Sequence, residues 1–469
     1  MDQPQRQTVN AGARLDRLPI SRFHWRMLIL ISSGAFLDAF DVYLASGVMA
    51  ATLKQGFSTL QTNALFISLT FLGMFIGAGL AGWVGDRFGR RFSYQANLAI
   101  FGVASLLACF APNMETLIGL RFVMGIGLGA ELVVAAGTLL EFIPPTHRGR
   151  WVALLGFIVN SGLLVATSVS YVVIPNFGWR AMFAIGGIGA IVIWIMRKKM
   201  PESPRWLESV GRHDEAEATL AAIEADVTAR TGEALPPVRP TRAAAPRKTP
   251  FSALFSREMR GRTLLAALTC MTANVAVYGF VAWLPTFFVK EGLTVVQSLG
   301  FTTLMALGAP GGAVVGFLLG DRIGRRRALL IFSFATIVLG VIYPQMRDAA
   351  SITVVGFTLV TCIYTIVTLG LFGYIPELFP TEYRLRGTGV AGMFGRAASM
   401  STPYLAVMLF QRFGLTGVLG MVTTVLAVLI LTMLLIKVET NQHSLEEISA
   451  EPGGAPLDGK LAQSTMQRR

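Results

Sequence analysis

The chain has 469 residues, of which 53% are hydrophobic and 14% are charged, and its mean hydropathy is +0.58. Soluble domains contain about 25% charged residues, so this composition excludes an ordinary soluble protein and indicates a chain that folds in a bilayer. A formal net charge of +13 raises the possibility of nucleic-acid binding. However, the cations lie in short loops between apolar runs and form no basic stripe with interleaved aromatic residues, so we expect no nucleic-acid partner.

Apolar runs long enough to cross a bilayer, which takes about 20 residues, occur along most of the chain. Six such runs precede a long polar stretch, at 25–50, 62–84, 93–111, 116–140, 151–174 and 180–200, and six follow it, at 263–289, 298–320, 327–346, 351–374, 388–411 and 415–437. We therefore predict an all-α membrane protein with twelve transmembrane helices in two six-helix halves, 25–200 and 263–437.

The loops alternate in charge, and arginines gather in every second loop, for example at 87–91 and 322–327. The positive-inside rule then places both termini in the cytoplasm. We expect the protein to lie in the inner membrane of the cell. The segments 1–24, 201–262 and 438–469 would be cytoplasmic. Apolar residues at helical spacing predict one or two short amphipathic helices on the cytoplasmic face within 204–229, namely at Leu207, Val210, Ala216, Leu220 and Ile223. The Pro-, Ala- and Arg-rich stretch 236–250 is typical of a flexible linker.

An internal repeat relates the two halves. The segment 85–91 recurs at 320–326, where Asp86 matches Asp321 with an offset of 321 − 86 = 235. Glu141 and Arg148 recur as Glu377 and Arg384 with an offset of 236. Two motifs that share one offset indicate duplicated halves, and the even number of helices between them gives both halves the same orientation.

These motifs resemble a known family. Residues 82–91 and 121–129 are similar to two signatures of the major facilitator superfamily, and 201–207 with 439–448 resemble its sugar-porter-like branch. The resemblance implies that the repeated loops act as gates; the alternative is that their charges only anchor helix ends. An ionic cluster that forms when the cytoplasmic side closes would favour the outward-facing state. The predicted gating residues are Asp86, Arg87, Arg90, Glu141, Arg148, Asp321, Arg322, Arg325, Glu377 and Arg384.

Ionisable residues at bilayer depth indicate function because each is costly to bury. Asp38 and Asp41 lie three residues apart on one face of the helix predicted at 25–50, and such a pair resists full ionisation, as a proton carrier must. In proton symporters of the sugar-porter-like branch, the aspartate matching Asp41 pairs with the arginine matching Arg121. Glu131 is a second candidate protonation site. The alternatives are a cap-like Asp38, a static Asp41–Arg121 pair and a Glu131 that supports helix packing.

Arg396 lies well inside the helix predicted at 388–411, and a buried guanidinium favours a carboxylate partner. The equivalent position in the first half is Asn160, so the repeat does not require this charge. Organic-anion transporters of the superfamily have a similar arginine; the alternative is a structural partner for Asp38, Asp41 or Glu131. Other groups that could line a small central site, or else pack between helices, are Tyr43, Asn160, Asn274, Tyr278, Trp283, Tyr364 and Tyr404.

The substrate class follows from resemblance and from what the helices lack. The run 263–289 has no glutamine and 351–374 no tryptophan, whereas sugar porters use both to bind polyols. Residues 376–384 look like those of organic-ion and aromatic-acid transporters, and 14–24 with 36–44 resemble bacterial niacin transporters. This implies alternating-access import of a small aromatic monocarboxylate, nicotinate first, with a proton. Alternatives are other aromatic acids, an organic cation, a facilitator without proton coupling, and a transporter-like sensor.

Cys109, Cys270 and Cys362 lie inside apolar runs without the spacing of metal ligands. We therefore expect no metal, no cofactor and no enzymatic activity. We also expect a monomer whose partners are the lipid bilayer, a proton and an organic acid.

Overall fold

The computed structural model describes residues 9–232, 234–238, 251–257, 259–379, 384–436 and 438, without the side chains of 81–83, 86, 132–134, 136, 231, 251, 321, 384 and 385. The described residues are helical or irregular, with no strand among them. Most of the predicted tail 438–469 and most of the linker 236–250 lie outside this description.

The N-terminal half follows the six predicted runs closely. The helices that overlap these runs are α2 (Arg22–Lys54), α3 (Leu60–Phe88), α4 (Arg90–Ala108), α5 (Met114–Phe142), α6 (Arg148–Phe177) and α7 (Arg180–Arg197). The motif 121–129 has a packing role here, because a Cβ added to Gly125 or Gly129 would overlap backbone atoms of α3. The glycines therefore allow α3 and α5 to approach closely.

The C-terminal half contains the same number of predicted runs, but several are interrupted. The first run is α10 (Arg260–Gly279), η3 (Val281–Trp283) and α11 (Leu284–Lys290), and the second is α12 (Val295–Ala306) and α13 (Gly308–Ile323). The third and fourth are α14 (Arg325–Ile342) with η4 (Tyr343–Gln345), and α15 (Ala349–Val367) with the π-helical η5 (Thr368–Tyr374) and α16 (Ile375–Glu377). The last two runs form α17 (Arg384–Leu435), which is broken at Gly414, where φ is 60° and ψ is −152°.

Nine segments of the described chain are long and apolar enough to cross a bilayer. One of the nine contains both predicted runs of α17. The helices α4 and α5, with 19 and 29 residues, are not among the nine. The fold is that of an all-α membrane protein, while the count of twelve spans stays a prediction. The repeat is visible in the backbone, because Gly89 and Gly324 have φ angles of 94° and 89° at the matching turns between α3 and α4 and between α13 and α14.

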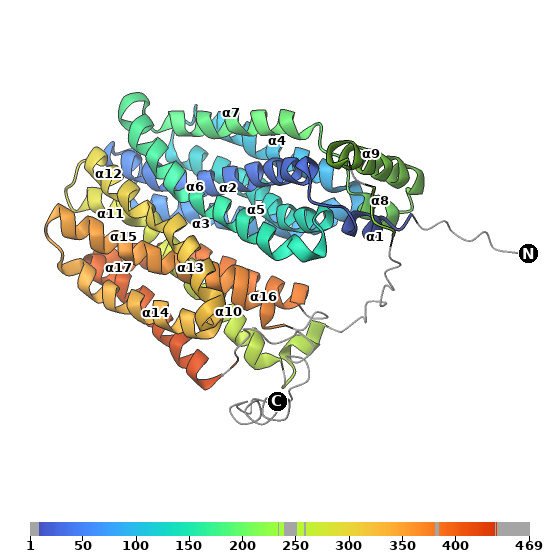
Figure 1. Ribbon diagram of the computed structural model, residues 1–469. Coiled ribbons are helices and arrows are strands. Elements are labelled where there is room, and N and C mark those ends of the chain that lie inside the picture. Colours follow the sequence, from blue (N-terminus) through green and yellow to red (C-terminus); the bar gives the residue numbers. More distant parts are fainter. Residues whose placement is uncertain are drawn as a thin grey trace, which may run out of the picture.

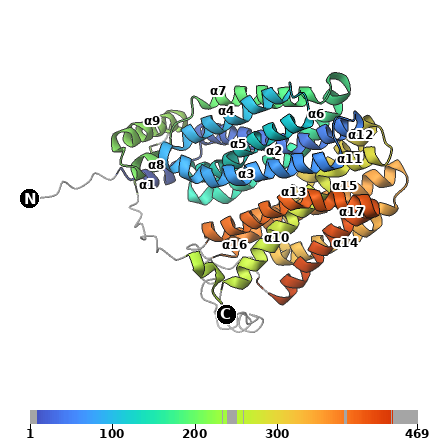
Figure 2. The ribbon, with the colours of Figure 1, turned by 180° about the vertical axis from the view of Figure 1, so that it is seen from behind.

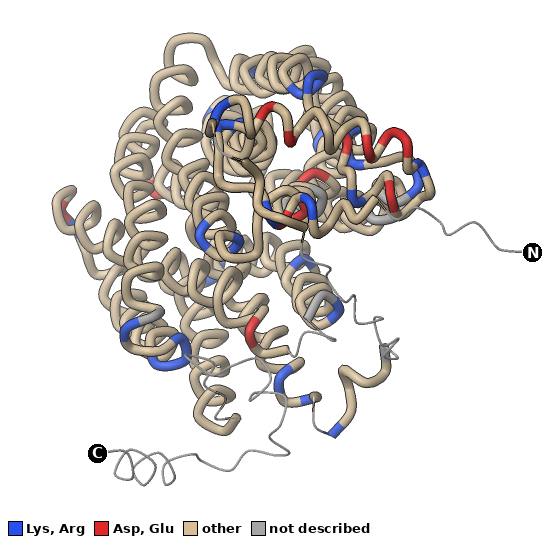
Figure 3. Tube along the Cα trace, turned by 45° about the vertical axis from the view of Figure 1, so that its right-hand side comes forward, with Lys and Arg blue, Asp and Glu red and all other residues tan. Residues whose placement is uncertain are grey.

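The two halves lie side by side and diverge toward one end of the molecule (Figures 1 and 2). Contacts between the halves join α2 to α11 and α12, α6 to α12 and α13, and α3 to α17. The end toward which the halves diverge is formed by α1 (Ala11–Asp16), α8 (Pro204–Ser209) and α9 (His213–Thr231), and we call it the α8–α9 end. Figure 3 shows that lysine, arginine and acidic residues concentrate there.

Two helices, α8 and α9, lie in the stretch 204–229 for which amphipathic helices were predicted. Leu220 and Ile223 are buried against the N-terminal half, in a cluster that includes Leu15 and Phe142, so the apolar face packs on protein. Val210 was predicted to belong to this face, but it is 45% exposed because it follows the end of α8. Within the predicted cytoplasmic segment 1–24, the described residues include α1, which packs on α8 and α9.

Candidate functional site

The first buried ion pair joins α2 to α5. The Nη1 atom of Arg121 donates to Oδ2 of Asp41 at 2.5 Å, and both side chains are fully buried. The guanidinium also lies 3.3 Å from the hydroxyl of Thr70 and 5.0 Å from the ring centroid of Phe66. The structure thus brings together the two residues whose pairing the family resemblance implies.

A second buried ion pair joins α5 to α7. The Nη1 atom of Arg197 donates to Oε1 of Glu131 at 2.5 Å, and the same guanidinium donates to the carbonyl oxygens of Leu30 and Ile31 at 2.7 and 2.9 Å. Gly34 of α2 makes room for the pair, because a Cβ there would overlap both charged groups. Arg197 was not predicted as a site residue, because it ends an apolar run beside Lys198 and Lys199 and therefore resembles an ordinary boundary cation.

Asp38 lies between these pairs and has no cation of its own. It is 6% exposed, and its Oδ2 atom contacts no hydrogen-bond donor among the described residues. Glu131, Arg197 and Asp41 all lie within electrostatic range of it. In the described part of the N-terminal half, the group therefore holds three carboxylates (Asp38, Asp41, Glu131) and two guanidiniums (Arg121, Arg197). We call these five residues the acidic cluster.

Arg396 has a different environment in the C-terminal half. Its side chain is half-buried and makes no hydrogen bond or ion pair with any residue that the structure describes. Asp41 and Glu131, which could have been its structural partners, bind Arg121 and Arg197 instead. The groups within electrostatic range of the guanidinium are Cys270 and Tyr278 of α10. This geometry leaves a cation available for an external anion.

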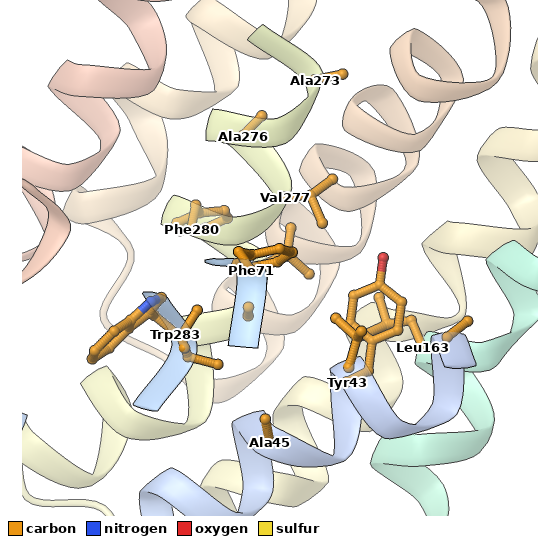
Figure 4. Packing of buried hydrophobic residues seen from close by; sticks show 14 of the residues in the cluster. Tyr43, Ala45, Phe71, Leu163, Ala273, Ala276, Val277, Phe280 and Trp283 are labelled. Carbon is orange, nitrogen blue, oxygen red and sulfur yellow. The ribbon is translucent and has the colours of Figure 1, made fainter. Parts of the chain in front are cut away.

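Aromatic side chains from both halves meet at Tyr278, next to Arg396. Tyr278 packs edge-on against Phe71 of α3, with ring centroids 4.4 Å apart, and its hydroxyl lies beside that of Tyr43. The hydroxyl of Tyr364 donates to that of Tyr43 at 2.6 Å, which connects α15 to α2 across the two halves. Figure 4 shows Phe71 between Tyr43 and Trp283. Phe71 was not predicted, because only the packing of α3 on α10 reveals its position.

The amides of the predicted site make specific contacts. Asn274 donates to the carbonyl oxygen of Cys270 at 2.7 Å and accepts from the hydroxyl of Ser399 at 2.8 Å, so it lies on the α10 face that meets α17. Asn160 donates to the hydroxyl of Thr368 at 3.4 Å and so faces η5. A π-helical turn shifts side chains relative to an α-helix and often occurs at functional sites.

Two predicted site residues lie outside this group. Trp283 is fully buried and stacks on Phe287, with centroids 5.7 Å apart, and Phe287 stacks in turn on Phe410. Tyr404 is 47% exposed on α17. The ring of Trp283 therefore packs on aromatic rings of the C-terminal half, and Tyr404 is exposed.

The loop charges at the α8–α9 end pair within each half. Arg90 binds Glu141 at 3.2 Å, and the equivalent Arg325 binds Glu377 at 2.7 Å, so the repeat holds at the level of ion pairs. Arg148 binds Asp16 at 3.2 Å instead of a repeated loop residue. No ion pair among the described residues crosses between the halves. Arg87 and Arg322 are exposed, and the side chains of Asp86, Asp321 and Arg384 are not described.

Known transport proteins are similar to this chain over most of its length. The sequence profile of the sugar (and other) transporter family matches residues 27–451. The chain belongs to this family of the major facilitator superfamily. It is 37% identical over 442 residues to the inner membrane metabolite transport protein YdjE of Escherichia coli, covering 93% of this chain and 98% of that protein. It is 33% identical over 441 residues to the niacin transporter NiaP of Acinetobacter baylyi, covering 93% and 99%.

A solved structure supports the fold of this major facilitator protein. The proton:xylose symporter XylE superposes with a TM-score of 0.70 at 19% sequence identity, covering 92% of this chain and 99% of that chain. At that identity the likeness shows the fold alone. The family match and the relatives identify a multi-pass inner-membrane transporter and not an enzyme.

Proposed function

We propose that this transporter imports a small aromatic monocarboxylate together with a proton, with nicotinate as the first substrate to test. The observation that supports the proposal best is Arg396, a half-buried guanidinium that makes no hydrogen bond or ion pair with the described residues and lies within electrostatic range of Tyr278. A guanidinium binds a carboxylate through two parallel hydrogen bonds, and aromatic side chains favour a flat heterocycle. The similarity to a niacin transporter agrees with this choice.

The binding site would lie between the halves. Arg396 binds the carboxylate, while the rings of Tyr278 and Phe71 contact the heterocycle from α10 and α3. Tyr43 and Tyr364 close the site from the other side through their mutual hydrogen bond. Few amide groups remain available, because Asn274 already bonds Cys270 and Ser399, which disfavours a polyol.

The proton would reside in the acidic cluster. Three carboxylates and two guanidiniums leave one excess negative charge, and one proton neutralises the cluster. Asp38 is the natural acceptor because neither guanidinium binds it, whereas Asp41 and Glu131 are each paired. A neutral cluster reorients at a lower cost in a low-dielectric environment than a charged one.

Transport would proceed by alternating access with the α8–α9 end in the cytoplasm, as the arginine-rich loops indicate. The segments 1–24, 201–262 and 438–469 are then cytoplasmic, and the protein acts as a monomer. The pairs Arg90–Glu141 and Arg325–Glu377 would fix the loops of each half, so that the halves move as separate bodies.

The test is uptake of labelled nicotinate into proteoliposomes with and without an inward proton gradient. The wild type should accumulate nicotinate only with the gradient. Asp38→Asn should still exchange nicotinate across the membrane but should not accumulate it, because its cluster cannot change charge. Arg257→Gln, a change at an exposed arginine outside the site, should behave as the wild type. Equilibration without accumulation in the wild type would contradict proton coupling, and no uptake would contradict nicotinate.

The excess carboxylate also favours a second candidate, export of a hydrophobic organic cation. Asp38 would then bind the cation directly, and Arg396 would have a structural role. Loss of labelled cation from loaded vesicles, abolished by Asp38→Asn and unaffected by Arg396→Gln, would support this function over acid import.

A further inference from the structure

A basic groove lies on the membrane-facing surface of the N-terminal half, at the α8–α9 end. It has a volume of about 550 Å³ and runs between the start of α2 and the end of α7. Its lining residues are Arg22, Trp25, Arg26, Ile29, Leu30, Ile195, Met196 and Lys199. None of these residues belongs to the acidic cluster or to the surroundings of Arg396, so the groove is a separate feature.

The cations of this groove have no acidic partner among the described residues. Arg22, Arg26 and Lys199 are all exposed, and they come from two different helix ends. Arg26 donates to the carbonyl oxygen of Lys199 at 3.3 Å, which connects the two walls. The neighbouring cations are engaged elsewhere, since Arg197 binds Glu131 and Lys198 lies over the ring of Trp194. The groove therefore presents three positive charges that are not compensated within the described chain.

The apolar part of the groove lies farther from the α8–α9 end than the cations. Ile29 follows Arg26 by about one turn of α2 and is 56% exposed, and Ile195 precedes Lys199 by about one turn of α7 and is 55% exposed. Trp25 is 49% exposed at the level of the cations, where tryptophan favours the membrane–water interface. This order of charge, indole and aliphatic surface matches the order of phosphate, glycerol and acyl chain in a phospholipid.

We propose that the groove is a binding site for one anionic phospholipid of the leaflet at the α8–α9 end. The phosphate contacts Arg22, Arg26 and Lys199, and an acyl chain lies along Ile29 and Ile195. A soluble anion would contact the cations but would make no contact with the exposed aliphatic surface. A zwitterionic lipid would contact that surface but would be attracted less strongly by the cations. Basic grooves between membrane helices are typical sites for anionic headgroups.

The site has a consequence for the ion pairs behind it. Leu30 lines the groove, and its carbonyl oxygen accepts a hydrogen bond from Nε of Arg197 at 2.7 Å. A bound lipid would hold α2 against α7 at the point where Arg197 binds Glu131. Occupancy should therefore stabilise the fold, whichever substrate the protein transports.

Trp25 offers a direct test. Purified protein in zwitterionic detergent micelles is titrated with phosphatidylglycerol or phosphatidylcholine carrying brominated acyl chains, and the Trp25 signal is taken as the difference between wild type and Trp25→Phe. Brominated phosphatidylglycerol should quench this signal at a several-fold lower mole fraction than brominated phosphatidylcholine. Arg22→Gln/Arg26→Gln/Lys199→Gln removes the three cations that favour the anionic headgroup, so this variant should quench equally with both lipids.

The control is Arg150→Gln/Arg257→Gln/Arg260→Gln, which removes the same charge from exposed arginines outside the groove. It should keep the preference of the wild type. Equal quenching by both lipids in the wild type, or an equal loss of preference in the control, would overturn the proposal. Reversal of the quenching by inorganic phosphate at the same concentration would also overturn it, because the groove would then bind an anion and not a lipid.

Discussion

The pair Arg197–Glu131 makes a sharp prediction about stability because its two members are not equivalent. Replacing Arg197 with Met leaves the carboxylate of Glu131 buried without a cation, next to the carboxylate of Asp38. Replacing Glu131 with Gln leaves the guanidinium with Asp38 within electrostatic range and with its two carbonyl partners, Leu30 and Ile31. The loss of the cation should therefore cost more than the loss of the anion.

The magnitudes follow from the burial of both groups. Breaking a buried ion pair at one side costs about 3–5 kcal/mol, so Arg197→Met should lower the free energy of unfolding by that amount. Glu131→Gln keeps a hydrogen-bond acceptor, so it should lower the free energy of unfolding by only about 1.5–3 kcal/mol, the contribution of a charge-assisted hydrogen bond. The double variant Arg197→Met/Glu131→Met leaves no unpaired charge at these two positions and should recover to within about 2 kcal/mol of the wild type.

The assay is denaturant-induced unfolding in mixed micelles, followed by tryptophan fluorescence for the wild type, both single variants and the double variant. The expected order of stability is wild type, then Glu131→Gln, then Arg197→Met, with the double variant above Arg197→Met. An Arg197→Met protein that is as stable as Glu131→Gln would refute the reasoning, because Asp38 would then not contribute charge to this region. A double variant less stable than both singles would refute the assignment of a paired ion.

Three further predictions concern single contacts. Gly34→Ala should lower stability by about 1–3 kcal/mol in the same assay, because its Cβ overlaps Arg197, whereas Gly119→Ala in open space should not. Tyr364→Phe removes the hydrogen bond to Tyr43 and should shift the equilibrium toward separated α2 and α15 by about fivefold, measured as spin-label distances between the halves; unchanged distances would contradict it. Burial alone would raise the pKa of Glu224, but hydrogen bonds from Arg14 and Arg17 lower this pKa overall. The stabilisation that these bonds give to the docking of α1 is therefore complete above the ordinary carboxyl pKa of about 4.5. It is lost as the pH falls through the lowered pKa of Glu224. Proteolysis within α1 should then rise in acid for the wild type, and already at neutral pH for Glu224→Gln.

The sequence predicted the membrane helices well because the bilayer imposes long apolar runs with charged ends. Each predicted run overlaps a described helix or series of helices, from α2 at 22–54 to α17. The interruptions were not predicted. The break after Gly279 and the π-helical η5 depend on packing between helices, and neither changes the hydropathy of its run.

The ion pairs divide in a similar way. The Asp41–Arg121 contact was expected only through family resemblance, since 80 residues separate its members. Arg197 was missed because a cation at the end of an apolar run looks like a boundary residue, and its burial becomes visible only when α7 packs on α2. The partner of Arg148 is Asp16, which lies in a segment whose sequence showed no helix signal.

The candidate site shows what pattern alone cannot reach. Arg396 was singled out by its position within an apolar run. Of the three alternative partners, Asp41 and Glu131 bind other arginines, and Asp38 lies within electrostatic range of Arg197. The proximity of Tyr43 and Tyr364, 321 residues apart, and the contact of Phe71 with Tyr278 arise only from the packing of the two halves. Trp283 was predicted either to line the site or to pack between helices, and its ring stacks on Phe287.

The central claim, that Arg396 binds the substrate carboxylate, is tested most directly by competition between nicotinate and its uncharged amide, nicotinamide. Binding to purified wild type and to Arg396→Gln is measured by calorimetry, with Arg412→Gln, a change at an exposed arginine of α17, as the control. Charge-assisted hydrogen bonds worth about 1.5–3 kcal/mol predict that the wild type and the control prefer nicotinate by about 10- to 150-fold, and that Arg396→Gln binds both compounds equally. An Arg396→Gln protein that keeps the preference for nicotinate would contradict the account.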